Sequence, residues 1–311
     1  MRVVFMGTPE FALPPLEQLV ANRYQVCGVY TQPDRLSGRG QHPVAPPLKM
    51  VARNLGLPVW QPASLKDSAT VAGLAALEPD VIVVAAYGQI LSQAVLDIPR
   101  QGSINLHPSL LPRYRGPSPV TGAILAGERF TGVSVMLMTP GLDSGPILSQ
   151  AQIAIADSDT TVTLTDKLSR VAAFMLQEIL DSWSRGEIIP RPQDDSLATY
   201  SRAIDKEDGE IDWQVTALDI WRRVRAYHPW PGSFTRWQGK RLNIVSAALS
   251  GEEGVSEGGR VVSLAGGAFG VQTGEGVLAV LQVQLEGKRI MSGTEFLRGQ
   301  RHLLDARLPA D

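Results

Sequence analysis

The chain has 311 residues, of which 44% are hydrophobic and 19% are charged, and its formal net charge is −2. This length favours two domains that each bury a core, and the near-neutral charge excludes a protein whose whole surface is cationic. Cys27 is the only cysteine, which excludes an intramolecular disulfide and a cysteine-based zinc site. No apolar run is long enough to span a membrane and no basic leader precedes the first apolar run, so the sequence predicts a cytoplasmic protein.

The first part of the chain alternates short apolar runs with amphipathic stretches of helical period, which is typical of a parallel sheet covered by helices. The predicted strands are residues 2–6, 25–30, 58–60, 81–85, 103–106 and 132–138. The predicted helices are residues 11–20, 46–54, 68–77, 120–126 and 161–184. The pattern predicts an α/β domain with a doubly wound, mostly parallel sheet over residues 1–185.

The character of the chain changes after residue 185. Residues 186–208 are polar and are interrupted by Pro190 and Pro192, which predicts an extended linker. Residues 209–311 hold one predicted helix at 215–226, followed by short apolar runs at 242–247, 259–264, 268–273 and 276–284 with Gly-rich turns between them. A small β barrel is the favoured interpretation of this second domain.

The first predicted strand ends in Gly7-Thr8-Pro9-Glu10-Phe11. A dinucleotide-binding loop needs three glycines at G-x-G-x-x-G spacing, and this turn lacks them. A strand-to-helix turn in which Pro9 begins the helix is the favoured interpretation, and no nicotinamide cofactor is expected.

Two polar side chains follow the alternation of the strand that starts at Ser103. Because strand side chains alternate between faces, Asn105 and His107 are expected to point to the same face at the carboxyl edge of the sheet, where open α/β sheets bind ligands. Pro108 favours an extended backbone at His107 and ends the strand. The structural alternatives are an asparagine at a sheet edge and a histidine bonded within the core.

A carboxylate follows the next predicted strand, in the loop of residues 139–146, where Asp143 lies between Gly141 and Gly145. Glycine lets the backbone approach a ligand, and adjacent strands are expected to bring Asp143 toward His107. Taken alone, Asp143 is interpreted as a turn former, whereas together with Asn105 and His107 it predicts a functional trio.

Such a trio suits acyl transfer without a covalent intermediate. The Asn105 amide would donate to the oxyanion that forms when an amine attacks a formyl carbonyl, and His107 would take the proton of that amine. Asp143 would orient the ring and favour imidazolium. A Ser-His-Asp hydrolase is the alternative, but the first domain has no G-x-S-x-G elbow, and Ser109 lies too close in sequence to His107 for a strained nucleophile turn.

The motifs around Asn105, His107 and Asp143 resemble those of a known enzyme family. Residues 105–107 and 109–112 (Asn-Leu-His and Ser-Leu-Leu-Pro), with Gly-Leu-Asp-Ser-Gly at 141–145, resemble the signature of the formyltransferases that use 10-formyltetrahydrofolate. Residues 7–11, 31–40, 86–88 and 225–231 resemble the members of that family that act on methionyl-tRNA. The match spans nearly the whole chain and includes a second domain that the purine-pathway formyltransferase lacks.

The resemblance implies a Rossmann-like catalytic domain over residues 1–185, a linker over residues 186–208, and an OB-like, tRNA-binding β barrel over residues 209–311. It implies that Asn105, His107 and Asp143 are the catalytic residues. The folate-binding residues that it implies are Ser109, Leu110, Leu111, Pro112, Tyr87 and Gly88. It implies 10-formyltetrahydrofolate as formyl donor and no metal ion.

Two stretches without acidic residues, 35–66 and 221–251, carry clustered basic side chains, and the second interleaves them with aromatic residues. Basic groups for phosphates and aromatic rings for bases are what an RNA surface needs, whereas solvated arginines and core tryptophans are the alternative. The predicted tRNA contacts are Arg39, Arg222, Arg225, Arg236 and Arg241. Family members often follow residues 38–40 with consecutive lysines, whereas Gln41-His42-Pro43 make this loop less basic.

The predicted reaction moves the formyl group of 10-formyltetrahydrofolate to the α-amino group of methionyl initiator tRNA, for translation initiation. Two alternatives keep the chemistry and change the acceptor to a nucleotide-linked amino sugar or to water, and a third is an RNA-binding protein without catalysis. The basic aromatic stretch argues against the amino sugar, and the lack of a following dehydrogenase domain argues against the hydrolase. No sustained heptad is present, so a monomer is expected.

Overall fold

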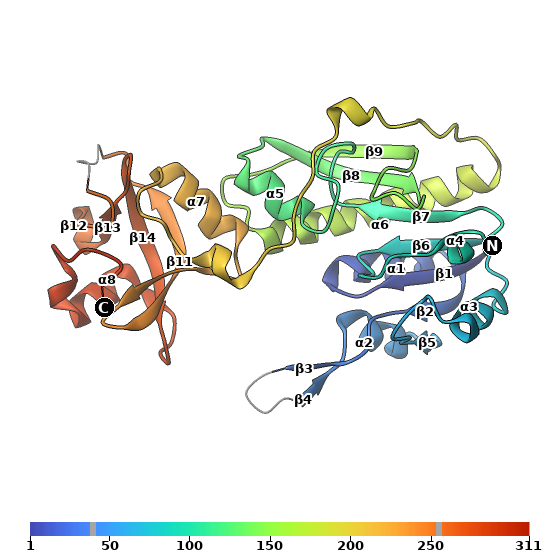
Figure 1. The fold of residues 1–311 in the computed structure, drawn as a ribbon, viewed down its shortest axis with the longest axis horizontal. Helices are drawn as coiled ribbons and strands as arrows, with labels where there is room; N and C mark the ends of the chain where they lie inside the picture. Colours follow the sequence, from blue (N-terminus) through green and yellow to red (C-terminus); the bar gives the residue numbers. More distant parts are fainter. Residues whose placement is uncertain (38–41, 253–256, 311) are drawn as a thin grey trace. The chain divides into compact units, whose positions relative to one another are not determined.

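The computed structural model describes residues 1–37, 42–252 and 257–310, and the chain forms two compact units (Figure 1). The first unit consists of residues 1–119, 130–154 and 164–201, and the second of residues 120–129, 155–163 and 202–311. The predicted linker is therefore divided between them, because residues 186–201 pack with the first unit. No helix among the described residues is both long enough and apolar enough to cross a membrane.

A seven-stranded sheet forms the centre of the first unit. Its strands, in spatial order, are β5 (Val59–Trp60), β2 (Gln25–Tyr30), β1 (Arg2–Gly7), β6 (Val81–Ala85), β7 (Ser103–His107), β8 (Phe130–Leu137) and β9 (Ile147–Ala154). The first five pair in parallel, whereas β8 and β9 add antiparallel strands at one edge. The predicted mostly parallel sheet is confirmed. All five residues of β6 are buried, as expected for a strand with helices on both faces.

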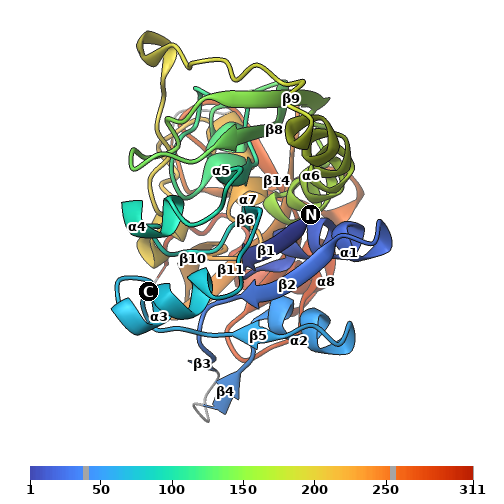
Figure 2. The same cartoon turned by 90° about the vertical axis from the view of Figure 1, so that its right-hand side faces the viewer.

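Helices cover both faces of this sheet. Figure 2 shows α1 (Leu13–Ala21), α2 (Pro47–Asn54) and α6 (Thr161–Ser184) on one face, and α3 (Ser68–Ala75) and the short α4 (Gln93–Leu96) on the other. A 3₁₀ turn at Glu10–Ala12 precedes α1, and Pro9 caps it, which is the strand-to-helix turn that the sequence predicted. The predicted apolar stripe of α6 is buried and includes Leu164, Leu168, Met175 and Ile179.

Besides β9 and α4, two short strands of the first unit were not predicted from the sequence. The strands β3 (Arg35–Ser37) and β4 (His42–Val44) form a separate antiparallel pair on either side of residues 38–41, which lie outside the described residues. Neither strand has a buried apolar face, since all three residues of β4 are exposed. Without alternating burial there is no hydrophobic pattern for sequence analysis to detect.

The second unit is built on an antiparallel sheet, which confirms the predicted β-rich second domain. Its strands run in the order β10 (Ser233–Trp237), β11 (Lys240–Leu249), β14 (Val277–Leu285), β13 (Phe269–Gln272) and β12 (Val261–Ser263), and β15 (Met291–Ser292) pairs with β14. The helices α7 (Ala217–Ala226) and α8 (Gly293–Gly299) pack on this sheet, and residues 120–125 of α5 (Pro119–Leu125) also belong to the second unit. The sheet core is apolar and includes Ile244, Val271 and Val280.

The strand β10 was not predicted as a strand, although it lies in the aromatic stretch considered for RNA binding. Phe234 and Trp237 of this strand are buried, and the buried Trp213 donates its indole N–H to Thr235. Trp230 stays 59% exposed. The alternative of core aromatic residues therefore holds for Phe234 and Trp237 but not for Trp230.

Candidate active site

The end of β7 places two polar side chains in one cavity. Asn105 and His107 both line a cavity of about 490 Å³, as the alternation of the strand predicted. The remaining walls come from residues 84–91 after β6, residues 116–119, and residues 136–143 after β8. The cavity therefore lies within the first unit, and its volume is in the range of small-molecule sites.

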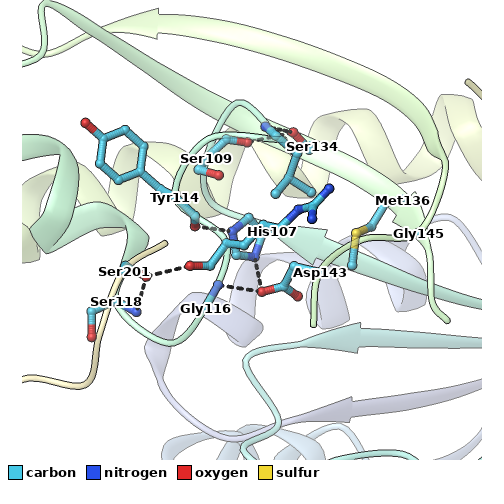
Figure 3. Close-up of polar contacts among 12 residues, drawn as sticks. His107, Ser109, Tyr114, Gly116, Ser118, Ser134, Met136, Asp143, Gly145 and Ser201 are labelled. Atoms are coloured by element: carbon cyan, nitrogen blue, oxygen red, sulfur yellow. Dashed lines mark hydrogen bonds and ion pairs between the residues drawn. The ribbon is translucent and has the colours of Figure 1, made fainter. Parts of the chain in front are cut away.

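The two ring nitrogens of His107 have different partners (Figure 3). Nε2 lies 3.0 Å from the carbonyl oxygen of Tyr114, and Nδ1 lies 3.7 Å from Oδ2 of Asp143. A carbonyl oxygen only accepts hydrogen bonds, so Nε2 carries the proton of the neutral ring and donates it to Tyr114. Nδ1 is then the basic nitrogen, and it faces a carboxylate.

Burial and charge act on His107 in opposite directions. The residue is only 4% exposed, and this burial lowers the pKa of its ring below the ordinary value. The carboxylate of Asp143 and the bond to the Tyr114 carbonyl both raise the pKa, but by less than burial lowers it. The ring is therefore neutral at pH 7, and it has a nearby negative charge that stabilises a proton once Nδ1 accepts one.

Asp143 reaches His107 by a route that the sequence did not predict. Because β8 is antiparallel to β7, Leu137 at its end pairs with Ile104 rather than with His107, so the following loop has to fold back along the sheet. Asp143 has a left-handed backbone with φ of 47°, and its Oδ2 accepts the N–H of Gly116 at 2.8 Å. Gly145 has no room for a side chain, since a Cβ there would lie 1.7 Å from the Leu137 carbonyl oxygen.

The amide of Asn105 is available for a ligand. The residue is 9% exposed, and its side chain makes no hydrogen bond to any other described residue. A largely buried amide that lines a cavity and makes no hydrogen bond within the described structure can donate to a bound oxygen.

The predicted folate-binding residues fall into two groups. Tyr87 and Gly88 line the cavity, and the buried hydroxyl of Tyr87 has no hydrogen-bond partner in the described structure. Residues 109–112 are not among the residues that line it. Ser109 donates its hydroxyl to the Arg113 carbonyl, and Leu111 is buried against Met136 and donates its backbone N–H to Ser134.

Two of the predicted tRNA-binding arginines are bound to their own unit. Arg225 stacks on the ring of Trp221, with 4.3 Å from Cζ to the ring centroid, and donates to the carbonyl oxygens of Ala156 and Asp159. Arg241 lies 3.7 Å from the ring centroid of Phe234 and donates to Asn243 and to the Pro231 carbonyl. Their guanidinium groups stabilise the fold around them.

The other predicted tRNA-binding arginines are less engaged. Arg236 is 53% exposed and lies 4.0 Å from Glu210, and Arg222 is 26% exposed and lies 3.6 Å from Asp219. Exposed pairs at such distances contribute little to stability, so these cations can change partners. Arg39 lies outside the described residues.

Four residues around the site were not singled out by sequence analysis. Ile90 and Leu142 line the cavity although they are 83% and 59% exposed, so they form an apolar rim. Arg115 and Gln193 are bonded to one another beside the loop of Asp143. Only the position of Arg115, in the motif-rich segment 103–119, offered a signal, because Gln193 lies in what is predicted as a linker.

Other candidate sites are less suited to this chemistry. A larger groove of about 660 Å³ lies in the second unit, but Glu252 and Glu275 are the only titratable side chains among the described residues that line it. Across the part of the chain that the structure describes, no three His, Cys, Asp or Glu side chains lie close enough together to hold a metal ion.

Comparison with known sequences identifies relatives of both units. Residues 1–180 match the family described as formyl transferase, and residues 203–301 match the formyl transferase C-terminal domain. The methionyl-tRNA formyltransferase of Chloroflexus aurantiacus is 49% identical over 300 residues, which cover 96% of this chain and 97% of the relative. That of Dehalococcoides mccartyi strain 195 is 48% identical over 312 residues, with 97% and 96% coverage.

Solved structures with the same fold are more distant in sequence. HypX from Aquifex aeolicus in complex with tetrahydrofolic acid matches with a TM-score of 0.63 at 18% identity, covering 96% of this chain and 47% of HypX. The chain thus spans about half the length of HypX. An N-formyltransferase from Helicobacter canadensis matches with a TM-score of 0.66 at 19% identity, covering 89% of this chain and 98% of that protein. At these identities the likeness concerns the fold.

Proposed function

Since this chain belongs to the methionyl-tRNA formyltransferase family, we propose that its cavity at the end of β7 transfers the formyl group of 10-formyltetrahydrofolate to the α-amino group of methionyl initiator tRNA. The product is N-formylmethionyl-tRNA, with which translation is initiated, and this role puts the enzyme in the cytoplasm. The observation that carries the assignment of the site is the His107 ring, whose basic Nδ1 faces Asp143 in the cavity that the Asn105 amide also lines.

The residues of the cavity fit a folate donor. Its lining is largely apolar, and the exposed Ile90 and Leu142 offer surface to a flat ring system. Tyr87 and Gly88 line the cavity and are proposed to contact the donor. Residues 109–112 are proposed to belong to the folate site as well, since Leu111 packs on Met136, which lines the cavity.

The reaction needs a base, a charge stabiliser and an oxyanion donor. When bound, 10-formyltetrahydrofolate supplies the electrophilic formyl carbon. His107 accepts the proton of the attacking amine at Nδ1, and Asp143 stabilises the imidazolium that results. Asn105 donates its amide N–H to the formyl oxygen as negative charge develops there. The new C–N bond replaces the bond to the folate nitrogen, and the proton held by His107 passes to that nitrogen as it leaves.

The acceptor tRNA is proposed to bind mainly through the second domain, residues 209–311, while residues 1–185 carry the chemistry and residues 186–208 connect them. Arg222 and Arg236 are the cations left to meet phosphates, and the exposed Trp230 can stack on a base or sugar. Arg225 and Arg241 are proposed to shape this surface. Arg39 is proposed as a further contact from the first domain. The proposed enzyme is a monomer that needs no metal ion.

The proposal is tested by the acceptor that releases tetrahydrofolate. Purified protein is mixed with 10-formyltetrahydrofolate and either methionyl initiator tRNA, a nucleotide-linked amino sugar, glycinamide ribonucleotide or water, with uncharged initiator tRNA as the matched control. Rapid release is expected only with methionyl initiator tRNA, because only this acceptor combines a free amine with the polyanion that the second domain is proposed to bind. Release with the amino sugar or with water would contradict the proposed acceptor.

A further inference from the structure

Residues 191–201, which the sequence predicts as part of a linker, are fastened along the first unit. Arg191 exchanges two backbone hydrogen bonds with Ile147 at the start of β9, of 2.8 and 2.9 Å. Farther along, the Thr199 carbonyl accepts the N–H of Arg115 at 2.9 Å, and the Ser201 N–H donates to the Arg115 carbonyl at 2.7 Å. We call residues 191–201 the strap. Gln193 lies between its two fastened ends.

The side-chain amide of Gln193 uses its full hydrogen-bonding capacity. Its Nε2 donates to the carbonyl oxygens of Asp143 and Gly145, at 2.8 and 2.7 Å. Its Oε1 accepts from Nε and Nη2 of Arg115, at 3.1 and 2.8 Å. Two donors on one side and two acceptors on the other fix the orientation of the amide, because a flipped amide would place oxygen against two carbonyls and nitrogen against a guanidinium.

The loop of residues 139–146, which Gln193 holds, depends on these hydrogen bonds for the position of Asp143. The left-handed backbone of Asp143 is unfavourable for a residue with a Cβ, and Leu142 beside it is 59% exposed. The carboxylate of Asp143 bonds to the Gly116 N–H, but the backbone carbonyl of Asp143 has Gln193 as its partner. Arg115, which holds Gln193, is 3% exposed and also pairs with Asp195.

We propose that Gln193 is a positioning residue for catalysis: it clamps the backbone on both sides of Ser144 so that the Asp143 carboxylate faces Nδ1 of His107. This inference rests on the proposed function of the site. Gln193 does not line the cavity, so it acts through Asp143 and not on the substrate. Because β8 runs antiparallel to β7, the pairing of the strands does not itself place Asp143 beside His107. The two hydrogen bonds from Gln193 hold the loop in that position.

The variant that separates the clamp from the packing of the strap is Gln193→Glu. A glutamate keeps the size of the side chain and the contact with Arg115 but has no N–H for the two carbonyls. We expect kcat to fall about 10- to 100-fold with little change in KM for methionyl initiator tRNA, since a displacement of about 1 Å in a catalytic group can cost that much. Asp194→Asn, at the neighbouring strap residue whose carboxylate accepts from Ser196, is the matched control and is expected to keep parental kcat and KM, because an asparagine oxygen can still accept.

Two readouts test whether Gln193 acts through Asp143. With the carboxylate displaced, the acid limb of the kcat/KM profile is expected to move to lower pH, because His107 loses the charge that raises its pKa. In a double-mutant cycle, Gln193→Glu is expected to cost less than about twofold in kcat when added to Asp143→Asn. The inference would be overturned if the acid limb of the kcat/KM profile stayed at the parental pH, or if the two substitutions lowered kcat by the product of their separate effects. Loss of the fold in Gln193→Glu would also overturn it. Lack of turnover in the parental enzyme would instead contradict the proposed function.

Discussion

Replacement of His107 by glutamine is expected to lower kcat with methionyl initiator tRNA by about 10²- to 10⁴-fold, the usual contribution of a positioned base. Glutamine can still donate to the Tyr114 carbonyl as Nε2 of His107 does at 3.0 Å, but it has no group that takes a proton at pH 7. The variant is therefore expected to fold and to bind tRNA. Steady-state kinetics, tRNA binding and the Tm together measure the effect.

His107→Ala serves as the comparison for this variant. Alanine removes the base and also the bond to Tyr114, and it leaves a void, so it is expected to lose the same activity and to have a lower Tm. A His107→Gln protein that turned over at the parental rate would show that His107 is not the base. Loss of tRNA binding together with turnover in both variants would point to misfolding.

Replacement of Asn105 by aspartate is the second large effect expected. The two side chains have the same shape, but an ionised carboxylate only accepts hydrogen bonds and repels an oxyanion. We expect kcat to fall by at least about 10²- to 10³-fold, the cost of removing one oxyanion donor, while the affinity for tRNA is retained. Since Asn105 makes no side-chain hydrogen bond to other described residues, the fold should not suffer from loss of the amide.

Asn105→Ala separates loss of the donor from added repulsion. Alanine removes the donor without adding a negative charge, so its kcat is expected to lie between that of the parental enzyme and that of Asn105→Asp. An Asn105→Asp enzyme that is as active as the parent, with an unchanged Tm, would rule out Asn105 as the oxyanion donor.

Most of the fold could be predicted from the sequence, because its main elements bury regular patterns. Strands such as β6 are apolar throughout, and α6 carries its buried residues at helical spacing, so both were located correctly. The elements that were missed lack such patterns. The four residues of α4 span little more than one turn, and β10 was interpreted from its charges and aromatic residues rather than as a buried strand. The predicted family and activity are confirmed by the relatives described above.

The site could be predicted only in part, for a physical reason. The two-residue alternation of β7 is local, so it places Asn105 and His107 on one face without any knowledge of the fold. The approach of Asp143 is not local, because its loop folds back along an antiparallel strand and is held by Gln193, 50 residues away. Likewise, the clustering of basic residues in the sequence does not distinguish Arg225 and Arg241, which stack on aromatic rings, from the exposed Arg236.

The protonation of the His107 ring tests most directly the claim that Nδ1 is the catalytic base and faces Asp143. Nitrogen-15 NMR of the enzyme labelled at its four histidines, with the His107 signals assigned by their loss in His107→Gln, reports which ring nitrogen carries the proton and at what pH the ring is charged. The account predicts a neutral ring protonated at Nε2, a pKa below the ordinary value of about 6.5, and a still lower pKa in Asp143→Asn, because burial remains and the attracting charge is gone. A neutral ring protonated at Nδ1, or a pKa above 6.5 that does not respond to Asp143→Asn, would contradict it.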